Sequence, residues 1–402
     1  MSVYIFDAVR TPRGKGRPDG SLAKVTPAQM VAQLARALER RNGREAVHAA
    51  EHFTLGCVTQ VGVQGGHVAL AARVQANLPD TLPSLSINNF CVSGLSALAD
   101  AARRVASGQA DLALAGGVES MSQVAFMTDN ADYYTDMGLA GAMGWAPPGL
   151  AADLLATREG VSRADLDAAV MRSHQRAAAA WTAGRYADRV IPVTAADGSI
   201  ALDRDENIRD FGDGATLARL GPVFAAAGAQ GFDEIMLAHK PELGKVEHLH
   251  TVAHCPPIAD GAALILVGTA EAGRRHGLKP LVRIRAIAES ADDKVMQLTA
   301  GFTALKRVLE RAGLAIGDLG AIEFMEAFAV APVLFERDFD VDMARVNPNG
   351  GHLAMGHPMG ATGAVLATTL LDDMAQLDAE TGLVAATGGV GVGAAMVFER
   401  VS

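Results

Sequence analysis

One cysteine stands where a nucleophile could be made. Cys91 lies in NNFCVSGLSAL, residues 88–98, and is one of three cysteines in 402 residues. It follows a predicted strand and precedes a predicted helix, whose free N–H groups and partial positive charge favour a thiolate. We therefore expect a lowered pKa for the Cys91 thiol and a backbone site for a developing oxyanion. A buried structural cysteine is the alternative.

A histidine in the second half of the chain could activate such a thiol. His357 lies in NGGHLAMGHPMGATG, residues 349–363, where several glycines allow unusual backbone angles. An imidazole in this loop could act as a general base toward a thiol and donate to a thioester oxygen. The alternative is a structural loop histidine, which is how we interpret His352.

The segments that carry these two residues resemble each other. Residues 91–121 run from a polar turn through a small-residue helix into a strand that ends Gly-Gly-Val, and residues 357–393 repeat this order. Two copies packed about a pseudo-twofold axis would bring both helix N-termini to the centre. Chance similarity between two segments rich in Ala and Gly is the alternative.

Apolar strands alternate with helices along most of the chain, which predicts an α/β fold with helices on both faces of the sheet. Strands are expected at 3–9, 52–58, 84–88 and 110–117, with helices at 26–41 and 92–107. Residues 118–250 differ, being turn-rich around one clear helix that starts after Ser162. We interpret them as an insertion that covers the site.

Composition narrows the class of protein. A net charge of −10 argues against nucleic acid as a partner. There is no run of about 18 apolar residues for a membrane span, and the first residues lack the pattern of a signal peptide. Three cysteines without an obvious pairing indicate a reducing compartment. We expect a cytoplasmic protein.

Two further patterns suggest other sites, and neither is complete. The histidines of EHLHTVAHC, residues 247–255, have no familiar zinc-site spacing, no CxxC motif accompanies them, and two prolines follow. The stretch GGVGVG, residues 388–393, resembles a dinucleotide-binding loop, but the required helix and ribose-binding acid do not follow. We expect no metal site, and a tight turn at 388–393 that lines the active site.

Several ordered motifs together resemble the thiolases, which are acyl-CoA:acetyl-CoA C-acyltransferases. They are DAVRTPRGKGRPDGSL, NNFCVSGLSAL, AGGVESMS, SHQRAAAAWTAGRYADRVIPV, DGAALILVG, EAFA and NPNGGHLAMGHPMGATGA. The resemblance covers essentially the whole chain. It implies two duplicated βαβαβαββ halves in a five-layered α-β-α-β-α arrangement with an inserted loop domain. Residues 1–270 would form the first half, with the CoA-binding loop domain at about 118–250, and residues 271–402 the second.

The resemblance also implies a chemistry. The residue matching Cys91 attacks a 3-ketoacyl-CoA or acetyl-CoA and becomes acylated, and the one matching His357 activates it. The backbone N–H groups of Cys91 and Gly389 would hold the oxyanion. Coenzyme A and acyl-CoA would be substrates, with no permanently bound cofactor. The residues that the resemblance places against CoA are His254, Cys255, Pro256 and Met355.

Three positions depart from the family pattern. Thr387 stands where a second catalytic cysteine moves a proton, and a hydroxyl is a very poor base at neutral pH. Met325 replaces the asparagine that positions a water. His254 and Pro256 replace the asparagine and serine before Asp-Gly-Ala, and an extra stretch around 229–245 precedes them. We expect a non-standard proton relay, for which His254, Cys255 or His352 are candidates.

Three functions remain open at this point. The first is a C-acyltransferase of thiolase type acting between acyl-CoA or 3-ketoacyl-CoA and CoA or acetyl-CoA, and the presence of both Cys91 and His357 favours it. The second passes the acyl group to water or another nucleophile, and the third is a CoA-binding partner subunit with decayed chemistry. The expected partners are acyl-CoA and CoA, without nucleic acid or membrane. We expect a homodimer or homotetramer, because the small residues of the Cys91 helix suit a subunit contact.

Overall fold

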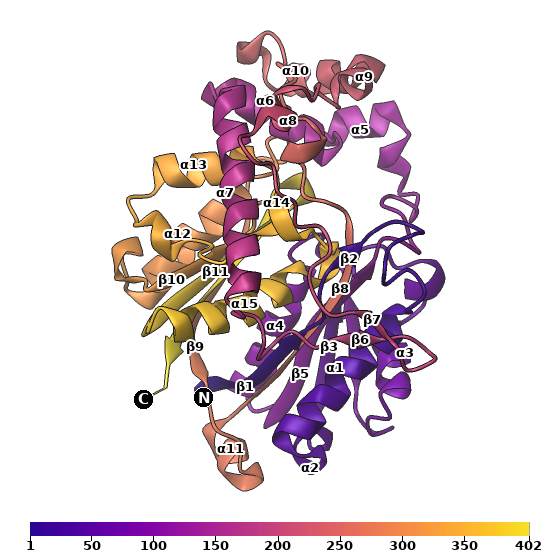
Figure 1. Ribbon diagram of the computed structural model, residues 1–402, viewed down its shortest axis with the longest axis vertical. Coiled ribbons are helices and arrows are strands. Elements are labelled where there is room, and N and C mark those ends of the chain that lie inside the picture. The colour runs from indigo at the N-terminus through magenta and orange to yellow at the C-terminus, as the bar shows by residue number, and fades with distance from the viewer. Residues whose placement is uncertain (402) are drawn as a thin grey trace.

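The two halves of the chain each build one half of a ten-stranded sheet. The computed structural model describes residues 1–401, and Figure 1 shows their arrangement. The strands of the first half are β1 (Val3–Arg10), β2 (Gly14–Lys15), β3 (His52–Gly56), β4 (Ser84–Ile87), β5 (Leu112–Ser120) and β8 (Ala259–Gly268). Those of the second half are β9 (Val282–Ala291), β10 (Ala321–Phe324), β11 (Thr381–Gly388) and β12 (Val392–Arg400).

Both halves use the same strand order and the same directions. In the first half the order β1–β8–β5–β3–β4 has two antiparallel pairings followed by two parallel ones. In the second half the order β9–β12–β11–β10 has two antiparallel pairings and one parallel pairing, and a parallel bridge from Ile322 to Val346 stands where β4 stands in the first. This agreement confirms the predicted duplication.

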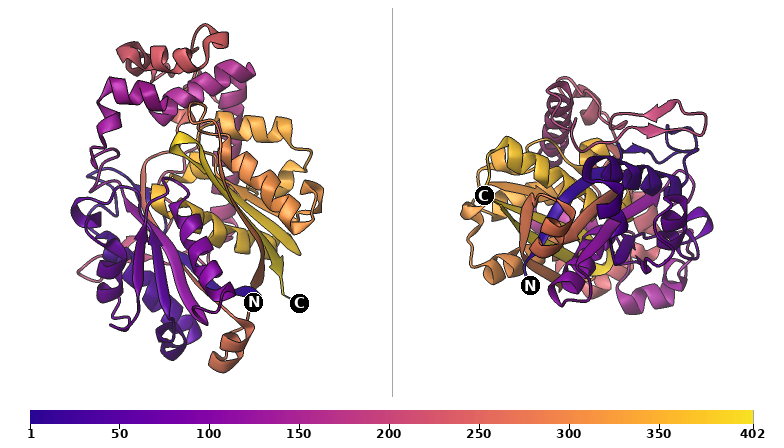
Figure 2. Two further views of the ribbon diagram at one scale, coloured as in Figure 1. Left: turned by 180° about the vertical axis from the view of Figure 1, so that it is seen from behind. Right: turned by 90° about the horizontal axis from the view of Figure 1, so that it is seen from below.

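Helices cover both faces of each half-sheet. The helices α1 (Pro27–Asn42) and α3 (Val68–Gln75) lie outside the first half, and α12 (Ala300–Ala312) and α13 (Val330–Asp338) lie outside the second. Between the half-sheets lie α4 (Ser93–Ala106) and α15 (Thr362–Gln376), which contact each other. The five predicted layers are confirmed, and antiparallel pairing of β1 with β9 joins the half-sheets along one edge (Figure 2).

The two central helices meet close to their N-termini, as the pseudo-twofold arrangement predicts. A Cβ at Gly94 would lie 2.8 Å from the backbone nitrogen of Ala364. Reciprocally, a Cβ at Gly363 would lie 2.3 Å from the backbone nitrogen of Leu95. The glycine at the start of each helix therefore allows the other helix to approach, which places the loops before both helices side by side.

Most helices of the chain between β5 and β8 gather at the top of Figure 1, whereas its strands β6 (Val193–Thr194) and β7 (Ile200–Leu202) lie lower, beside the first half. The helices of this segment are α5 (Met137–Met143), α6 (Pro148–Glu159), α7 (Arg163–Thr182), α8 (Ala215–Ala218), α9 (Ala225–Ala227) and α10 (Asp233–His239). The expected capping residue Ser162 starts α7. The remaining helices are α2 (Arg44–His48), α11 (Ala270–His276) and α14 (His352–Met355). Within residues 1–401, none of the helices has both the length and the apolar character to cross a bilayer.

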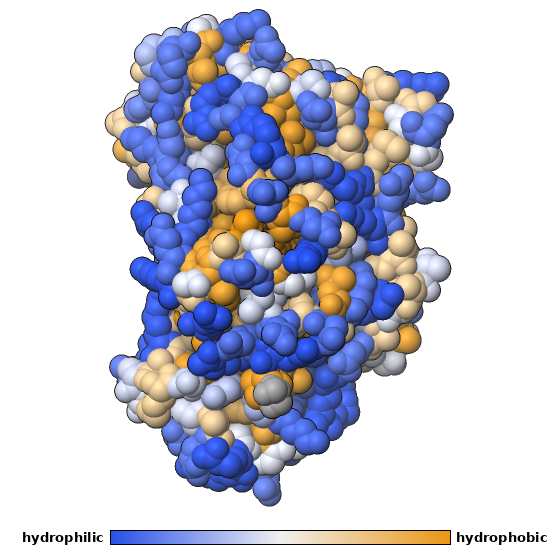
Figure 3. Space-filling model, turned by 90° about the vertical axis from the view of Figure 1, so that its left-hand side faces the viewer, coloured by the Kyte–Doolittle hydropathy of each residue, from blue (hydrophilic) through white to orange (hydrophobic). Residues whose placement is uncertain are grey.

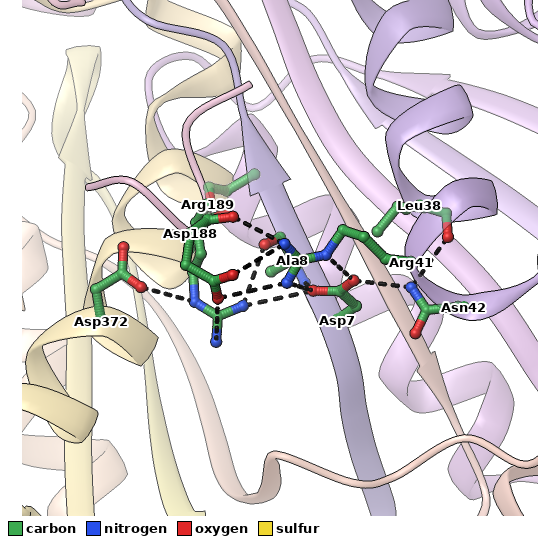
Figure 4. A network of polar contacts seen from close by, with 10 residues as sticks. Asp7, Ala8, Leu38, Arg41, Asn42, Asp188, Arg189 and Asp372 are labelled. Atoms are coloured by element: carbon green, nitrogen blue, oxygen red, sulfur yellow. Dashed lines mark hydrogen bonds and ion pairs between the residues drawn. The ribbon is translucent and has the colours of Figure 1, made fainter. Parts of the chain in front are cut away.

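An ion-pair network ties the inserted segment to both halves (Figure 4). Asp7 on β1 accepts from Arg41 Nε at 2.6 Å and lies 3.5 Å from Arg189 Nη1. Arg41 also pairs with Asp188, and Arg189 pairs with Asp372 on α15 at 2.9 Å. Arg189 is largely buried, and the carboxylates of Asp7 and Asp372 compensate its charge from the two halves. The network therefore fixes the segment around 188–189 against the central layer.

Candidate active site

A cavity of about 390 Å³ opens where the central loops meet the inserted segment. Cys91 and His357 both line it, so the residues that the sequence analysis paired share one space. The space-filling view shows apolar residues gathered around a hollow below the upper helices (Figure 3). The remaining lining residues are Val58, Phe90, Met121, Phe126, Met127, Tyr134, Trp145, Pro147, Pro148, Gly149, Phe224, Cys255, Pro256, Ile258, Leu298, Met325, Ala327, Phe328, Met359, Thr387, Gly388, Gly389 and Val390.

The sulfur of Cys91 lies beside the turn that follows β11. A Cβ at Gly388 would lie 3.2 Å from the backbone nitrogen of Cys91, so the two loops are in contact. Burial dominates the pKa of this sulfur and raises it, while the backbone N–H groups of Gly389 and Cys91 act on the pKa in the lowering direction. Two N–H groups from different halves of the molecule thus converge on the atom that would carry an acyl group.

The expected low pKa of the Cys91 thiol is wrong. Loss of hydration in the apolar cavity, together with the Glu119 carboxylate, raises the pKa to about 12 despite the two N–H groups. The N-terminus of α4 does little to lower the pKa of the Cys91 thiol, because the N–H groups of Val92 and Ser93 already donate to the carbonyls of Asn89 and Phe90. Cys91 is a neutral thiol at pH 7 and needs a base to become a nucleophile.

His357 is held as a neutral imidazole. Burial, and secondarily the positive charge of Arg13, lower its pKa to about 3. Its Nδ1 lies 2.7 Å from Oγ1 of Thr362, and that hydroxyl donates to the Pro358 carbonyl at 3.2 Å. Because the single hydroxyl proton is used there, Thr362 accepts from Nδ1–H, and Nε2 keeps its lone pair as a proton acceptor.

The backbone around His357 depends on one glycine. Gly356 has φ = 100°, a conformation that favours glycine. A Cβ at this position would also lie 2.9 Å from Cβ of Ala259. The His357 N–H donates to the Pro257 carbonyl at 2.8 Å, which fixes the loop against the segment before β8.

Glu119 is a buried residue of the site that the sequence analysis missed. Its carboxylate accepts from the backbone N–H groups of Val58 at 2.9 Å, Thr59 at 3.1 Å and Gly360 at 2.8 Å. Burial nevertheless raises its pKa. Glu119 thus joins the first half to the loop that carries His357, and its motif, AGGVESMS, was the only sequence signal.

Thr387 and Met325, which the sequence analysis expected to depart from the family pattern, both line the cavity and offer a ligand few polar groups. The Thr387 hydroxyl donates to the Gln297 carbonyl at 3.2 Å, so its proton is already engaged. Met325 presents a thioether to the cavity, where it has no N–H to offer a ligand.

The four predicted CoA-contact residues divide into two groups. Cys255 and Pro256 line the cavity. His254 is buried outside it, with Nε2 2.7 Å from Asp167 and Nδ1 accepting from the Thr251 N–H. Met355 is also buried outside it, where its sulfur accepts from the guanidinium of Arg13. The geometry gives no support to CoA contact by His254 or Met355, since their neighbours within the fold occupy them.

The histidines considered as zinc ligands pair with carboxylates instead. Asp153 on α6 lies 2.7 Å from Nδ1 of His250 and 2.9 Å from Nδ1 of His248. The second nitrogen of His248 faces Asp233 at 3.1 Å. Among residues 1–401, no cluster of three or more His, Cys, Asp or Glu side chains is arranged to hold a metal ion.

An aromatic wall of the cavity was not predicted. It consists of Phe126, Tyr134, Trp145, Phe224 and Phe328. Residues 126–145 contain two of the four tyrosines and one of the two tryptophans of the chain, and this local enrichment was the available signal. Because the segment lacks a clear helical or strand period, its pattern does not indicate that these rings face Cys91.

Comparison with known proteins places the chain among acyl-CoA enzymes. Residues 3–230 match the model for the thiolase N-terminal domain, and residues 278–400 match the model for the thiolase C-terminal domain. The chain is 35% identical over 419 residues to a beta-ketoadipyl-CoA thiolase of Pseudomonas knackmussii, covering 99% of each protein. It is 34% identical over 405 residues to a 3-ketoacyl-CoA thiolase of Photorhabdus laumondii, again covering 99% of each.

Proposed function

This chain belongs to the thiolase family and is an acyl-CoA acyltransferase, and we propose that it works through an acyl-Cys91 intermediate. The acyl group would pass between acyl-CoA or 3-ketoacyl-CoA and CoA or acetyl-CoA. One observation carries the proposal: the Cys91 sulfur, the His357 imidazole and the Gly389 turn line one cavity. The relatives include both beta-ketoadipyl-CoA and 3-ketoacyl-CoA thiolases, so sequence identity does not decide which acyl group this chain transfers.

We propose that the first step starts from a neutral thiol. As the Cys91 sulfur bonds to the 3-keto carbon of a 3-ketoacyl-CoA, its proton passes to Nε2 of His357. The resulting oxyanion would accept from the N–H groups of Cys91 and Gly389, which also act on the pKa of the neighbouring sulfur. Collapse breaks the carbon–carbon bond and leaves acyl-Cys91 and the enolate of acetyl-CoA.

The enolate needs a proton, and we propose that Cys255 supplies it. Of the three candidate carriers, all within the described chain, His254 and His352 are buried away from the cavity, whereas Cys255 lines it. Burial, with the nearby Asp153, raises the Cys255 pKa to about 12, so the thiol starts protonated, as an acid must. Its proton points at the Thr251 carbonyl at 3.3 Å and would have to turn into the cavity, but a thiol is a weak donor and far more acidic than the hydroxyl of Thr387. The Cys255 thiol would protonate the enolate carbon and then recover a proton from the thiol of incoming CoA. The CoA thiolate attacks acyl-Cys91, and the leaving Cys91 sulfur takes its proton back from His357.

The decisive experiment combines an adduct measurement with a thiolysis assay. Mass spectrometry after mixing with acyl-CoA should place an acyl group on Cys91, and Cys91→Ala should abolish both the adduct and turnover. Cys255→Ala should keep the adduct but lower thiolysis about 10²–10⁴-fold, the usual effect of losing a positioned acid. Cys57→Ala is the matched control and should keep both the adduct and thiolysis, since Cys57 is a buried cysteine that contacts Glu119 and does not line the cavity.

Two outcomes would point to the other functions. An adduct without thiolysis in the wild-type protein would favour transfer to water or another nucleophile. The Thr387 hydroxyl is consistent with this function, because its proton is bound to the Gln297 carbonyl and is not free for carbon–carbon cleavage. Stabilisation by CoA without any adduct would indicate a CoA-binding partner subunit.

We further propose a cytoplasmic homodimer or homotetramer and domains at 1–270 and 271–402, with the loop domain at about 118–250. Light scattering would measure the oligomeric state.

A further inference from the structure

We propose that the acyl group this cavity accepts is large, apolar and uncharged, rather than acetyl or an acyl chain that ends in a carboxylate. The inference rests on the proposed function, because it assigns the substrate class of the same site. It is carried by three features of the cavity: the rings of the aromatic wall, the charges near it and its size.

Four of the five rings of the aromatic wall, all except Phe126, pack against one another or against a neighbouring ring. Trp145 packs against Tyr134 and against Phe232, with ring centroids 5.2 and 5.6 Å apart. Phe224 lies 6.2 Å from Phe328 in an edge-to-face arrangement. The Phe224 ring also covers Gly149, where a Cβ would lie only 2.0 Å from Cζ. Since packed neighbours hold these rings, the wall offers a ligand a preformed apolar surface.

The charges around the cavity disfavour an anionic acyl chain. Among its lining residues, all within 1–401, there is no Lys or Arg. The one histidine of the lining, His357, is neutral. The Tyr134 hydroxyl donates to the Asp129 carboxylate at 3.3 Å, which uses its proton and places a negative charge behind the wall. The carboxylate of such an acyl chain would therefore be buried without a counter-ion, which is costly.

The size of the cavity disfavours acetyl as the best acyl group. A volume of about 390 Å³ is within the range of pockets that enclose drug-sized ligands. An acetyl group on Cys91 would leave most of the aromatic wall without a partner. Each methylene that a longer chain buries there should improve binding about fourfold.

Binding to the Cys91→Ala protein tests the inference independently of turnover. Calorimetry with octanoyl-CoA, adipyl-CoA and acetyl-CoA should give at least tenfold tighter binding of octanoyl-CoA than of either other ligand. Equal or tighter binding of adipyl-CoA or acetyl-CoA would overturn the inference. If octanoyl-CoA is preferred but the wild-type protein neither forms an adduct nor turns over, the proposed function fails and the inference on the acyl class stands.

A charge-introducing variant sharpens the test. Phe126 lines the cavity and is 41% exposed, so Phe126→Lys should be tolerated in the fold. In the Cys91→Ala background it should shift the octanoyl-to-adipyl affinity ratio at least tenfold toward adipyl-CoA. Phe126→Leu is the control, which should leave the preference for octanoyl-CoA in place. No shift with Phe126→Lys would show that the acyl chain does not reach the wall and would also overturn the inference.

Discussion

The Thr362 hydroxyl lies 2.7 Å from Nδ1 of His357 and is itself tied to the Pro358 carbonyl. The direction of donation along these two hydrogen bonds sets the tautomer of the imidazole. With the hydroxyl proton directed at the carbonyl, Nδ1 must carry the ring proton, and Nε2 must be the basic nitrogen. A residue that touches no substrate thus decides which nitrogen of His357 can accept the proton of Cys91.

Thr362→Val should lower the rate of Cys91 acylation about 10–100-fold, the range typical of losing a residue that orients a functional histidine. Valine keeps the shape of threonine but removes the acceptor for Nδ1–H, so the imidazole loses its fixed tautomer. The measurement is the rate of adduct formation from acyl-CoA. Thr362→Ser keeps the hydroxyl and should retain most of the rate; an equal loss in both variants would mean that packing, and not the hydrogen bond, matters.

Alkylation of Cys91 should report a thiol of high pKa. With the pKa near 12, the thiolate fraction rises tenfold with each pH unit from 6 to 9. The rate of reaction with iodoacetamide should rise in proportion and reach no plateau in that range. Peptide mass spectrometry in the Cys255→Ser protein would assign the label to Cys91. A rate that levels off below pH 7 would instead indicate a thiolate paired with a charged His357.

Thr387→Cys should create a proton carrier at the position where the resemblance implies a second catalytic cysteine. The hydroxyl of Thr387 is engaged by the Gln297 carbonyl and is too weak an acid to serve. In the Cys255→Ala background, the added cysteine should raise thiolysis at least tenfold, since positioned acid–base groups contribute about 10²–10⁴-fold. Thr387→Ser is the control and should give no gain. Failure of the cysteine to rescue a protein that still forms acyl-Cys91 would show that the proton step runs elsewhere.

The arrangement of Cys91 and His357 could be predicted because it follows from the duplication. Each residue precedes a helix that begins with a small-residue pair, and the contacts of Gly94 and Gly363 bring those helix starts together. The spacing of strand, turn and helix around each residue is local in the sequence, and it is enough to place Cys91 and His357 before the two central helices.

The electrostatics of the site could not be predicted in the same way. The position of Cys91 before a helix suggested a low pKa, but the apolar residues that dehydrate the sulfur come from distant segments, among them Met121 and Met359. Likewise, His254 matched a CoA-contact position, yet Asp167 on α7 holds it away from the cavity. Both differences arise from side chains brought together only by the tertiary fold.

The buried carboxyl pair of Glu323 on β10 and Asp373 on α15 gives a last prediction, on stability. Oε1 of Glu323 and Oδ2 of Asp373 have no hydrogen-bond partner unless the pair shares a proton. Burial is the main cause that raises the pKa of Asp373 to about 7, and burial with the Asp373 charge raises that of Glu323 well above its ordinary value. The remaining Asp373 oxygen accepts from Asn349 Nδ2 at 2.7 Å.

The sign of the pH dependence follows from these raised values. Between about pH 4 and 7 the folded protein keeps a proton on Asp373 that the unfolded chain releases, so the free energy of unfolding falls as pH rises through this window. Asp373→Asn removes that titration and can still accept from Asn349. At pH 8 it should therefore be more stable than wild type, because the folded variant no longer holds an ionised Asp373 beside Glu323, with a much smaller difference at pH 5. Thermal unfolding of both proteins at the two pH values is the measurement, and a variant that is less stable than wild type at pH 8 would show that the ionised pair is compensated in the folded state.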